Sequence, residues 1–175
     1  MIPCPQERRT YFVTTVTANR RRPFQVETNA LLMVETLLEY RAQHRFALHA
    51  FVVMPDHLHA LLTPAPQVSL EKAMPYIKGG FSFRLKGRFP VWEKSYNEVR
   101  VSNAEKFDVF QKYIEENPVR SRLSGSIAGY PHSSVHCPHA LDPIPSQFQV
   151  SAIRKAGLQP GLVSYPNQRP EGPNP

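Results

Sequence analysis

The sequence contains few cysteines and no long apolar run. Cys4 and Cys137 are its only cysteines, and both lie in segments without regular apolar spacing. We therefore expect no disulfide framework, and a reducing cytoplasm is the natural compartment. The first residues lack the apolar core of a signal peptide. The longest apolar runs, such as residues 50–54, are far too short to cross a bilayer, so no membrane partner is expected.

The sequence contains more Lys and Arg than Asp and Glu. The chain of 175 residues carries a net charge of +7, and 41% of its residues are hydrophobic, enough for one domain with a core. Residues 1–124 hold 18 Lys and Arg against 12 Asp and Glu. Most of the excess thus falls in the part that is patterned as folded, which indicates a polyanionic partner.

Apolar spacing predicts seven elements in residues 1–124. Strands are expected at 9–18, 46–53, 57–63 and 91–101, where β-branched and aromatic residues are frequent. Helices are expected at 28–44, 69–86 and 102–117, with a kink or a later start at Pro75 and an end at Pro118. This order predicts an α+β fold with an antiparallel sheet and the helices on one face.

The pattern weakens after residue 124. Nine of the 18 prolines lie beyond it, and periodic apolar spacing is lost. We expect a domain over 1–124, a loop-rich extension over 125–139, and a Pro-rich, mostly disordered tail over 140–175.

His57 and His59 alternate along the third expected strand. Residues two apart on a strand point to the same face, so both imidazoles project together. Such a pair can hold a divalent ion through one neutral nitrogen each. Taken alone, the motif is more often a pair of ordinary histidines at a hairpin, since the sequence has seven histidines that can pair by chance.

Tyr113 and Asn117 lie four residues apart on the last expected helix, one turn from each other. The Asn117 amide oxygen could add a third metal ligand and leave positions open for a substrate. Taken alone, the spacing favours another interpretation, in which Tyr113 is an aromatic residue at the edge of the core and Asn117 a residue at the helix end.

Three segments together resemble a known family. They are ALHAFVVMPDHLHALLTP at 47–64, SLEKAMPYIKGGFSFRLK at 69–86, and VWEKSYNEVRV with FQKYIEENPVRSRL within 91–123. In this order they resemble the IS200/IS605-type Y1 transposases, and among these the REP-associated tyrosine transposases. The resemblance covers about residues 9–123.

This resemblance implies a HUH endonuclease fold, with a ferredoxin-like sheet and the two histidines on a central strand. It implies that His57, His59 and Asn117 bind a divalent metal, Mg²⁺ or Mn²⁺, and that Tyr113 is the nucleophile. The expected activity is that of a single-strand DNA endonuclease and transposase that acts on hairpin-forming repeats through a 5′-phosphotyrosine. A monomer is expected, with a homodimer as the alternative, in the bacterial cytoplasm at the nucleoid.

Several cations are predicted to follow the DNA backbone. They are Arg20, Arg21, Arg22, Lys78, Arg84, Lys86 and Arg88. Phe81 and Phe83 are considered for base stacking, although core packing is the better interpretation of Phe81 because it continues an apolar stripe.

Parts of the sequence are also compatible with other functions and sites. One is a regulator on the same fold that binds DNA hairpins without cutting them. Another is a histidine-triad phosphoesterase, disfavoured because Leu61, not a third histidine, continues the alternation. A zinc site formed by His132, His136, Cys137 and His139 is disfavoured because the spacing fits no standard zinc site.

Overall fold

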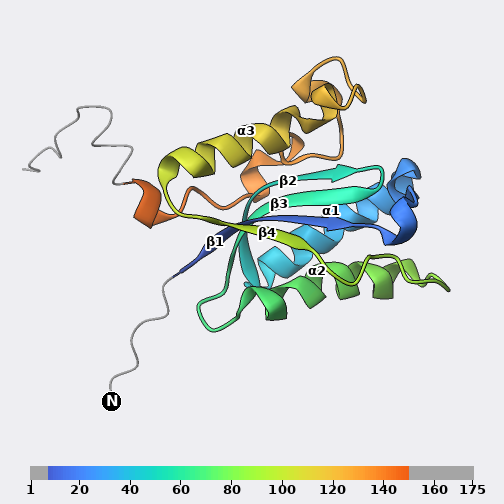
Figure 1. Cartoon of the computed structure of the whole chain (residues 1–175), viewed down its shortest axis with the longest axis horizontal. Coiled ribbons are helices and arrows are strands. Elements are labelled where there is room, and N and C mark those ends of the chain that lie inside the picture. The colour runs from blue at the N-terminus through green and yellow to red at the C-terminus, as the bar shows by residue number, and fades with distance from the viewer. Residues whose placement is uncertain (1–7, 150–175) are drawn as a thin grey trace, which may run out of the picture.

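A four-stranded antiparallel sheet organises the computed structural model, which describes residues 8–149 (Figure 1). The strands are β1 (Thr10–Val16), β2 (Phe46–Met54), β3 (His57–Pro64) and β4 (Asn97–Val101), in the order β2-β3-β1-β4. The long helices are α1 (Glu27–Ala42), α2 (Leu70–Leu85) and α3 (Ala104–Arg120). The βαββαβ succession is the ferredoxin-like arrangement, which confirms the α+β class and the antiparallel sheet.

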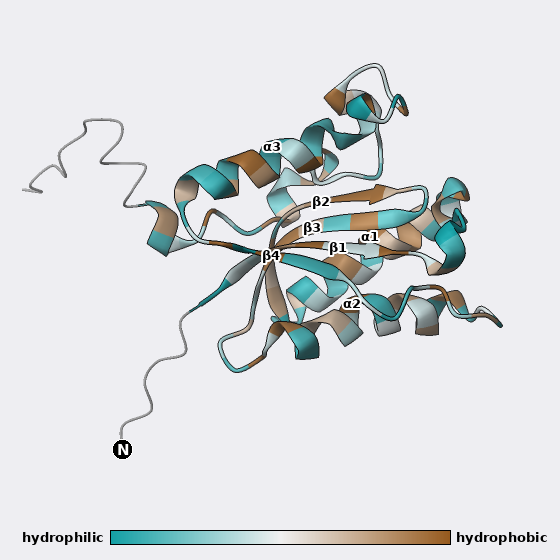
Figure 2. Cartoon of the chain, in the orientation of Figure 1, coloured by the Kyte–Doolittle hydropathy of each residue, from teal (hydrophilic) through white to brown (hydrophobic). Residues whose placement is uncertain are grey.

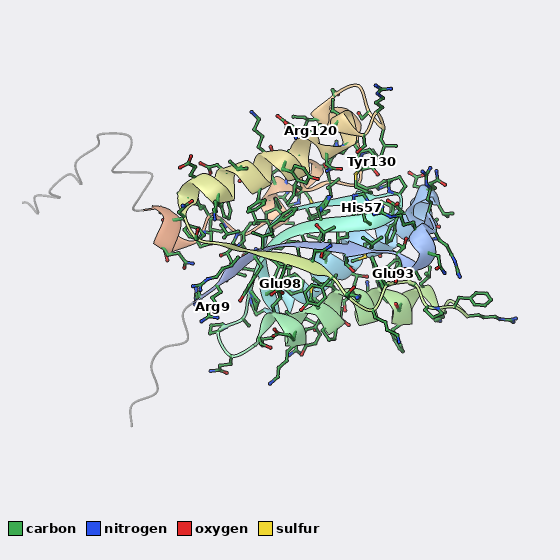
Figure 3. The ribbon with its side chains drawn as sticks, in the orientation of Figure 1. Arg9, His57, Glu93, Glu98, Arg120 and Tyr130 are labelled. Atoms are coloured by element: carbon green, nitrogen blue, oxygen red, sulfur yellow. The ribbon has the colours of Figure 1, made fainter. Side chains whose placement is uncertain are left out.

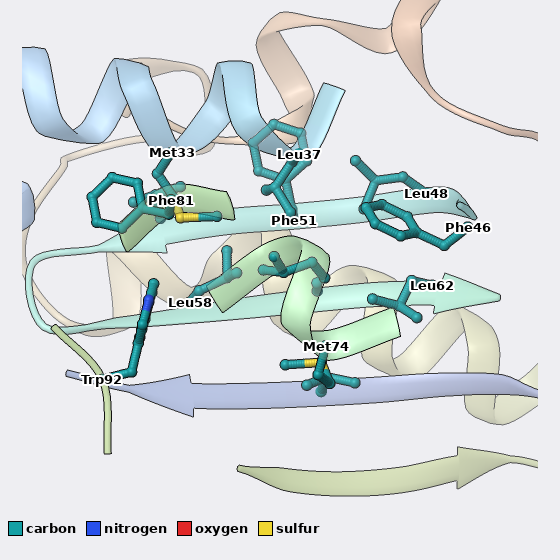
Figure 4. Packing of buried hydrophobic residues seen from close by; sticks show 14 of the residues in the cluster. Met33, Leu37, Phe46, Leu48, Phe51, Leu58, Leu62, Met74, Phe81 and Trp92 are labelled. Atoms are coloured by element: carbon teal, nitrogen blue, oxygen red, sulfur yellow. The ribbon is translucent and has the colours of Figure 1, made fainter. Parts of the chain in front are cut away.

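The helices lie on both faces of the sheet. On one face, Met33 of α1 and Phe81 of α2 pack with Phe51 and Leu58 of the sheet (Figure 4). On the other face, Ile114 of α3 packs in a second apolar cluster with strand residues. The expectation of helices on one face is wrong for α3, which lies on the opposite side of the sheet from α1 and α2 (Figure 2). The strands β2 and β3 are buried on both sides, so each side needs a cover.

Two prolines lie inside helices. Pro75 cannot donate to the carbonyl of Glu71, but both residues are exposed and that carbonyl can bind water. The helix α2 therefore begins at Leu70, not at Pro75. Pro118 does not end α3, which runs on to Arg120 because only the last turn is affected.

The strand β4 is shorter than predicted. Residues 93–95 were expected in the strand, but their carbonyl oxygens accept hydrogen bonds from the Lys78 ammonium at 2.7, 3.1 and 3.3 Å. Trp92 makes an isolated bridge with Thr17. The segment before β4 is thus a loop anchored to both α2 and the end of β1.

The chain after α3 packs along β2. Residue Ser133 bridges to Val52, and the amide of Val53 donates to the carbonyl of His132 at 2.9 Å. Farther on, Asp142 forms a two-bond ion pair with Arg41, both bonds at 2.9 Å. Residues 140–149 were expected to begin a disordered tail, but they pack on the domain; residues 150–175 lie outside the described part. Within residues 8–149, no helix is long and apolar enough to span a membrane.

Candidate active site

The two histidines of β3 lie side by side on the face that α3 covers. Both follow the turn at residues 55–56, and they are two residues apart, so their side chains share a face. Their ring centroids are 4.7 Å apart. His59 is buried and His57 is half-buried at the end of the sheet (Figure 3).

Each imidazole has a partner for its Nδ1 atom. His57 Nδ1 donates to Asp56 Oδ1 at 2.6 Å, and His59 Nδ1 shares a hydrogen bond with Thr14 Oγ1 at 2.8 Å. A carboxylate accepts only, so Asp56 fixes the tautomer of His57 with the proton on Nδ1. Among the described residues, neither Nε2 has a hydrogen-bond partner.

The electrostatics keep His59 uncharged. Burial, together with the neighbouring His57, lowers the pKa of His59 to about 3. Burial raises the pKa of Asp56, but the bonds from His57 and Arg20 outweigh it and leave that pKa below its ordinary value. At neutral pH the site therefore combines a neutral His59 with an ionised carboxylate that orients His57.

Tyr113 lies against the histidine pair. Its ring meets the ring of His59 edge to face, with centroids 5.4 Å apart, and that of Phe12 in the same way at 5.7 Å. Phe12 also stacks on His59 at 5.4 Å. On the other side, the guanidinium carbon of Arg120 is 5.8 Å from the Tyr113 centroid. The fold thus brings together residues that are more than fifty positions apart in sequence.

Asn117 is placed one turn beyond Tyr113 on α3. It is 6% exposed, and its Oδ1 accepts a long hydrogen bond, 3.5 Å, from the Ser121 hydroxyl. In the described part of the chain it makes no hydrogen bond with either histidine. Asn117 is therefore buried on α3 one turn after Tyr113, and its contacts alone do not make it a metal ligand.

The donor set fits a divalent ion. Two imidazoles that share a face, each with Nδ1 engaged and with Nε2 unbonded among the described residues, are the usual arrangement of metal-binding histidines. Residues 8–149 contain no group of three or more His, Cys, Asp and Glu side chains suited to a metal. Within this range, a third protein ligand would be of another residue type, and the alternative zinc cluster of His132, His136, Cys137 and His139 is not assembled.

The cations predicted to follow DNA divide into two sets. Those of the first set are exposed and lie in the loops after β1 and α2: Arg20, Arg21, Arg22, Lys86 and Arg88. These loops meet, since the amide of Ala18 donates to the carbonyl of Val91 at 2.8 Å. Arg20 reaches Asp56 at 3.4 Å, which places this basic surface beside His57.

The second set, Lys78 and Arg84, bonds to other groups of the protein. The ammonium of Lys78 donates hydrogen bonds to three backbone carbonyls. Burial lowers the pKa of Lys78. Arg84 pairs with Glu39 of α1. Phe81 is fully buried in the core, whereas Phe83 is 82% exposed. Lys78 and Arg84 thus have structural partners that their positions in sequence did not reveal.

Several site residues were not recognised in the sequence. Asp56 was not predicted as a site residue, although its position next to His57 was a usable signal. Thr14 and Phe12 gave no signal, because only the pairing of β1 with β3 brings Thr14 opposite His59. Phe89, 70% exposed next to Arg21, was also missed.

Comparisons with known proteins agree on one family. Residues 5–117 match the family model described as "Transposase IS200 like". The chain is 24% identical over 128 residues to a REP-associated tyrosine transposase of Escherichia coli (strain K12), a match that covers 73% of this chain and 76% of the relative. A solved structure of a REP-associated tyrosine transposase bound to a REP hairpin aligns with a TM-score of 0.66 at 23% identity, over 78% of this chain and 83% of that one. That alignment shows a common fold.

Proposed function

The chain belongs to the IS200-like transposase family, and from that premise we propose that it is a metal-dependent single-strand DNA endonuclease and transesterase. Its proposed substrate is DNA with hairpin-forming repeats, by analogy with the relative solved on a REP hairpin. The observation that carries the proposal is the contact of Tyr113 with His59, at 5.4 Å between ring centroids, beside a second histidine.

The proposed reaction exchanges one phosphodiester for another. The Tyr113 oxygen attacks the phosphorus, the bond from phosphorus to the 3′ oxygen breaks, and a 5′-phosphotyrosine forms. The phenolic proton leaves Tyr113, and the departing 3′ oxygen takes up a proton to become a hydroxyl. The energy of the phosphodiester is kept in the covalent adduct, so that a 3′-hydroxyl can later reverse the step without ATP.

The residues around Tyr113 position its ring. Phe12 and His59 each pack against the ring of Tyr113 in a T-shaped contact, and Phe12 is itself stacked on Phe110 at 4.5 Å. A ring held between packed neighbours loses little conformational entropy when it reacts. The packing of the ring therefore limits the positions that the Tyr113 hydroxyl can take.

The proposed metal ligands are His57 and His59, with the amide oxygen of Asn117 as the third. A bound Mg²⁺ or Mn²⁺ would supply Lewis-acid polarisation of a non-bridging phosphate oxygen. A mixed set of imidazoles and an amide suits Mn²⁺ somewhat better than Mg²⁺. Asp56 and Thr14 would hold the two imidazoles in the ligating tautomer.

A monomer suffices for this chemistry. The histidines and Tyr113 meet within one chain, so that no second copy is required to supply the tyrosine. A DNA partner would place the protein at the bacterial nucleoid.

The test is formation of a covalent protein–DNA adduct. The protein is incubated with Mn²⁺ and a labelled hairpin oligonucleotide that has single-stranded flanks, and the products are run on a denaturing gel. Wild type should give a slow-migrating adduct that EDTA abolishes, and Tyr113→Phe should give none because only the hydroxyl is removed. Tyr76→Phe is the matched control, since Tyr76 is a half-buried tyrosine on α2 that packs on Tyr40.

Two outcomes would reject the enzymatic proposal. One is an adduct that persists in Tyr113→Phe. The other is tight binding of hairpins by wild type without any adduct or cleavage, which would favour the hairpin-binding regulator.

A further inference from the structure

Phe89 is an exposed aromatic residue that neither apolar cluster includes. It is 70% exposed, in the loop between α2 and β4. The loop is not loosely attached on its β4 side. Trp92, 8% exposed, packs in the core and its indole donates to the carbonyl of Lys78 at 3.0 Å. Phe89 is therefore presented to solvent three residues from a fixed anchor.

A cation already faces the ring. The guanidinium carbon of Arg21 is 5.6 Å from the Phe89 centroid, which is within the range of a cation–π contact. Four more exposed cations lie in the same two loops: Arg20, Arg22, Lys86 and Arg88. Arginine planes and aromatic rings together are typical of surfaces that bind single-stranded nucleic acid.

The acidic groups of this surface are engaged. Asp56 bonds to His57 and to Arg20, and Glu93 Oε1 accepts from the amide of Asn19 at 2.8 Å. The surface is thus basic in its net effect. Because Arg20 contacts Asp56 and Asp56 contacts His57, it is continuous with the candidate active site.

We propose that Phe89, with Arg21 against its ring, is a base-stacking platform for the single-stranded part of the DNA substrate. This inference rests on the proposed function and adds a recognition residue to it. Every base has a π face, so stacking on Phe89 holds a nucleotide whatever its sequence, while the neighbouring cations bind its phosphates. A nucleotide held there would place the strand along the loop that leads to His57.

The test separates the base from the phosphate. Binding of two fluorescent 12-mers, oligothymidylate and an abasic strand of equal charge, is measured by anisotropy in EDTA. Wild type should bind the thymidylate more tightly. Phe89→Ala should weaken thymidylate binding roughly 5- to 150-fold, as expected for loss of one stacked base, and leave abasic binding unchanged. Arg21→Gln should weaken binding of both strands, because it removes a charge.

Phe83→Ala is the control, since Phe83 is an even more exposed phenylalanine, on α2. It should leave both affinities unchanged. The proposal is overturned if wild type binds the two strands equally, if Phe89→Ala binds thymidylate like wild type, or if Phe83→Ala loses as much. Because the assay uses neither metal nor Tyr113, base-dependent binding through Phe89 without any adduct would reject the enzyme and retain the platform.

Discussion

At the scale of the residue, the two histidines of β3 differ in the group that orients them. His57 is held by the carboxylate of Asp56, whereas His59 is held by the hydroxyl of Thr14. A carboxylate makes the stronger, charge-assisted hydrogen bond. Under the proposed function, Asp56 would therefore contribute more to metal binding than Thr14.

Asp56→Ala should lower the affinity for Mn²⁺ about 10- to 100-fold, because His57 loses the partner that fixes its tautomer and orientation. The affinity is measured by titration calorimetry of the purified protein. Asp108→Ala is the matched control: it removes an exposed carboxylate of α3 and should leave the affinity unchanged. Equal Mn²⁺ affinity in Asp56→Ala and wild type would show that Asp56 has no such role.

The candidate site could be predicted from sequence only where the spacing of residues within one strand or helix determines which face they share. Alternation along a strand predicted that His57 and His59 share a face, and helical spacing predicted that Tyr113 and Asn117 are neighbours on one helix. Nothing local predicted that α3 would lie on the face of the histidines. The partner of His59, Thr14, is 45 positions away and follows only from strand register.

At the scale of the element, strand and helix identities were predictable, but their ends and faces were less so. The run FALHAFVVM in β2 is nearly all apolar, and it is buried on both sides. Such a continuous apolar run indicates that both faces of the strand are covered. A strand with one face in solvent would instead alternate apolar and polar residues. The late start of β4 had no such signal, because it depends on a lysine of α2 that donates to three carbonyls of the preceding segment.

The segment after α3 is tied to β2 through a buried histidine. His49 Nδ1 contacts the carbonyl of Asp142 at 3.2 Å, and its Nε2 bonds to the Thr63 hydroxyl at 2.9 Å. Thr63 in turn bonds to the Thr10 hydroxyl at 2.8 Å. This chain is satisfied when His49 is neutral and donates to Asp142, so that its Nε2 accepts from Thr63.

Acidification should destabilise the protein partly through His49. Burial lowers its pKa below the 6.5 of an exposed histidine, so the unfolded chain binds the proton more readily. Stability should fall as pH drops below about 6.5, with up to about 1.4 kcal/mol per pH unit from this one group. Urea unfolding of wild type and His49→Gln between pH 7.5 and 5 measures the difference.

In that comparison, His49→Gln should have the shallower pH dependence, because the other buried histidines, His59 among them, titrate in both proteins. Identical slopes for the two proteins would contradict a neutral, buried His49.

At the scale of the whole molecule, the chain carries a net charge of +7, and a group of exposed cations lies at one end of the sheet. The loops that carry Arg20, Arg22 and Arg88 lie at the end where β1 finishes and β3 begins, with His57 beside them. The N-termini of α2 and α3 lie at the other end. Single-stranded DNA bound by charge is therefore expected at the His57 end.

The double variant Arg22→Gln with Arg88→Gln should reduce the salt dependence of DNA binding. Two phosphate contacts fewer should lower the slope of log K against log salt by about 1.4 for a single strand. Anisotropy titrations between low and physiological salt give the slope. Lys72→Gln with Lys106→Gln, which removes two exposed cations at the opposite end, should leave it unchanged, and equal effects of the two pairs would contradict a localised DNA surface.

The most direct test of the central claim is the identity of the residue that becomes bonded to DNA. The adduct formed with Mn²⁺ and a hairpin oligonucleotide is digested with nuclease and protease, and the modified peptide is sequenced by mass spectrometry. The nucleotide should be attached to Tyr113 through its 5′ phosphate. Attachment to another residue, or through a 3′ phosphate, would contradict the assignment of Tyr113 as nucleophile.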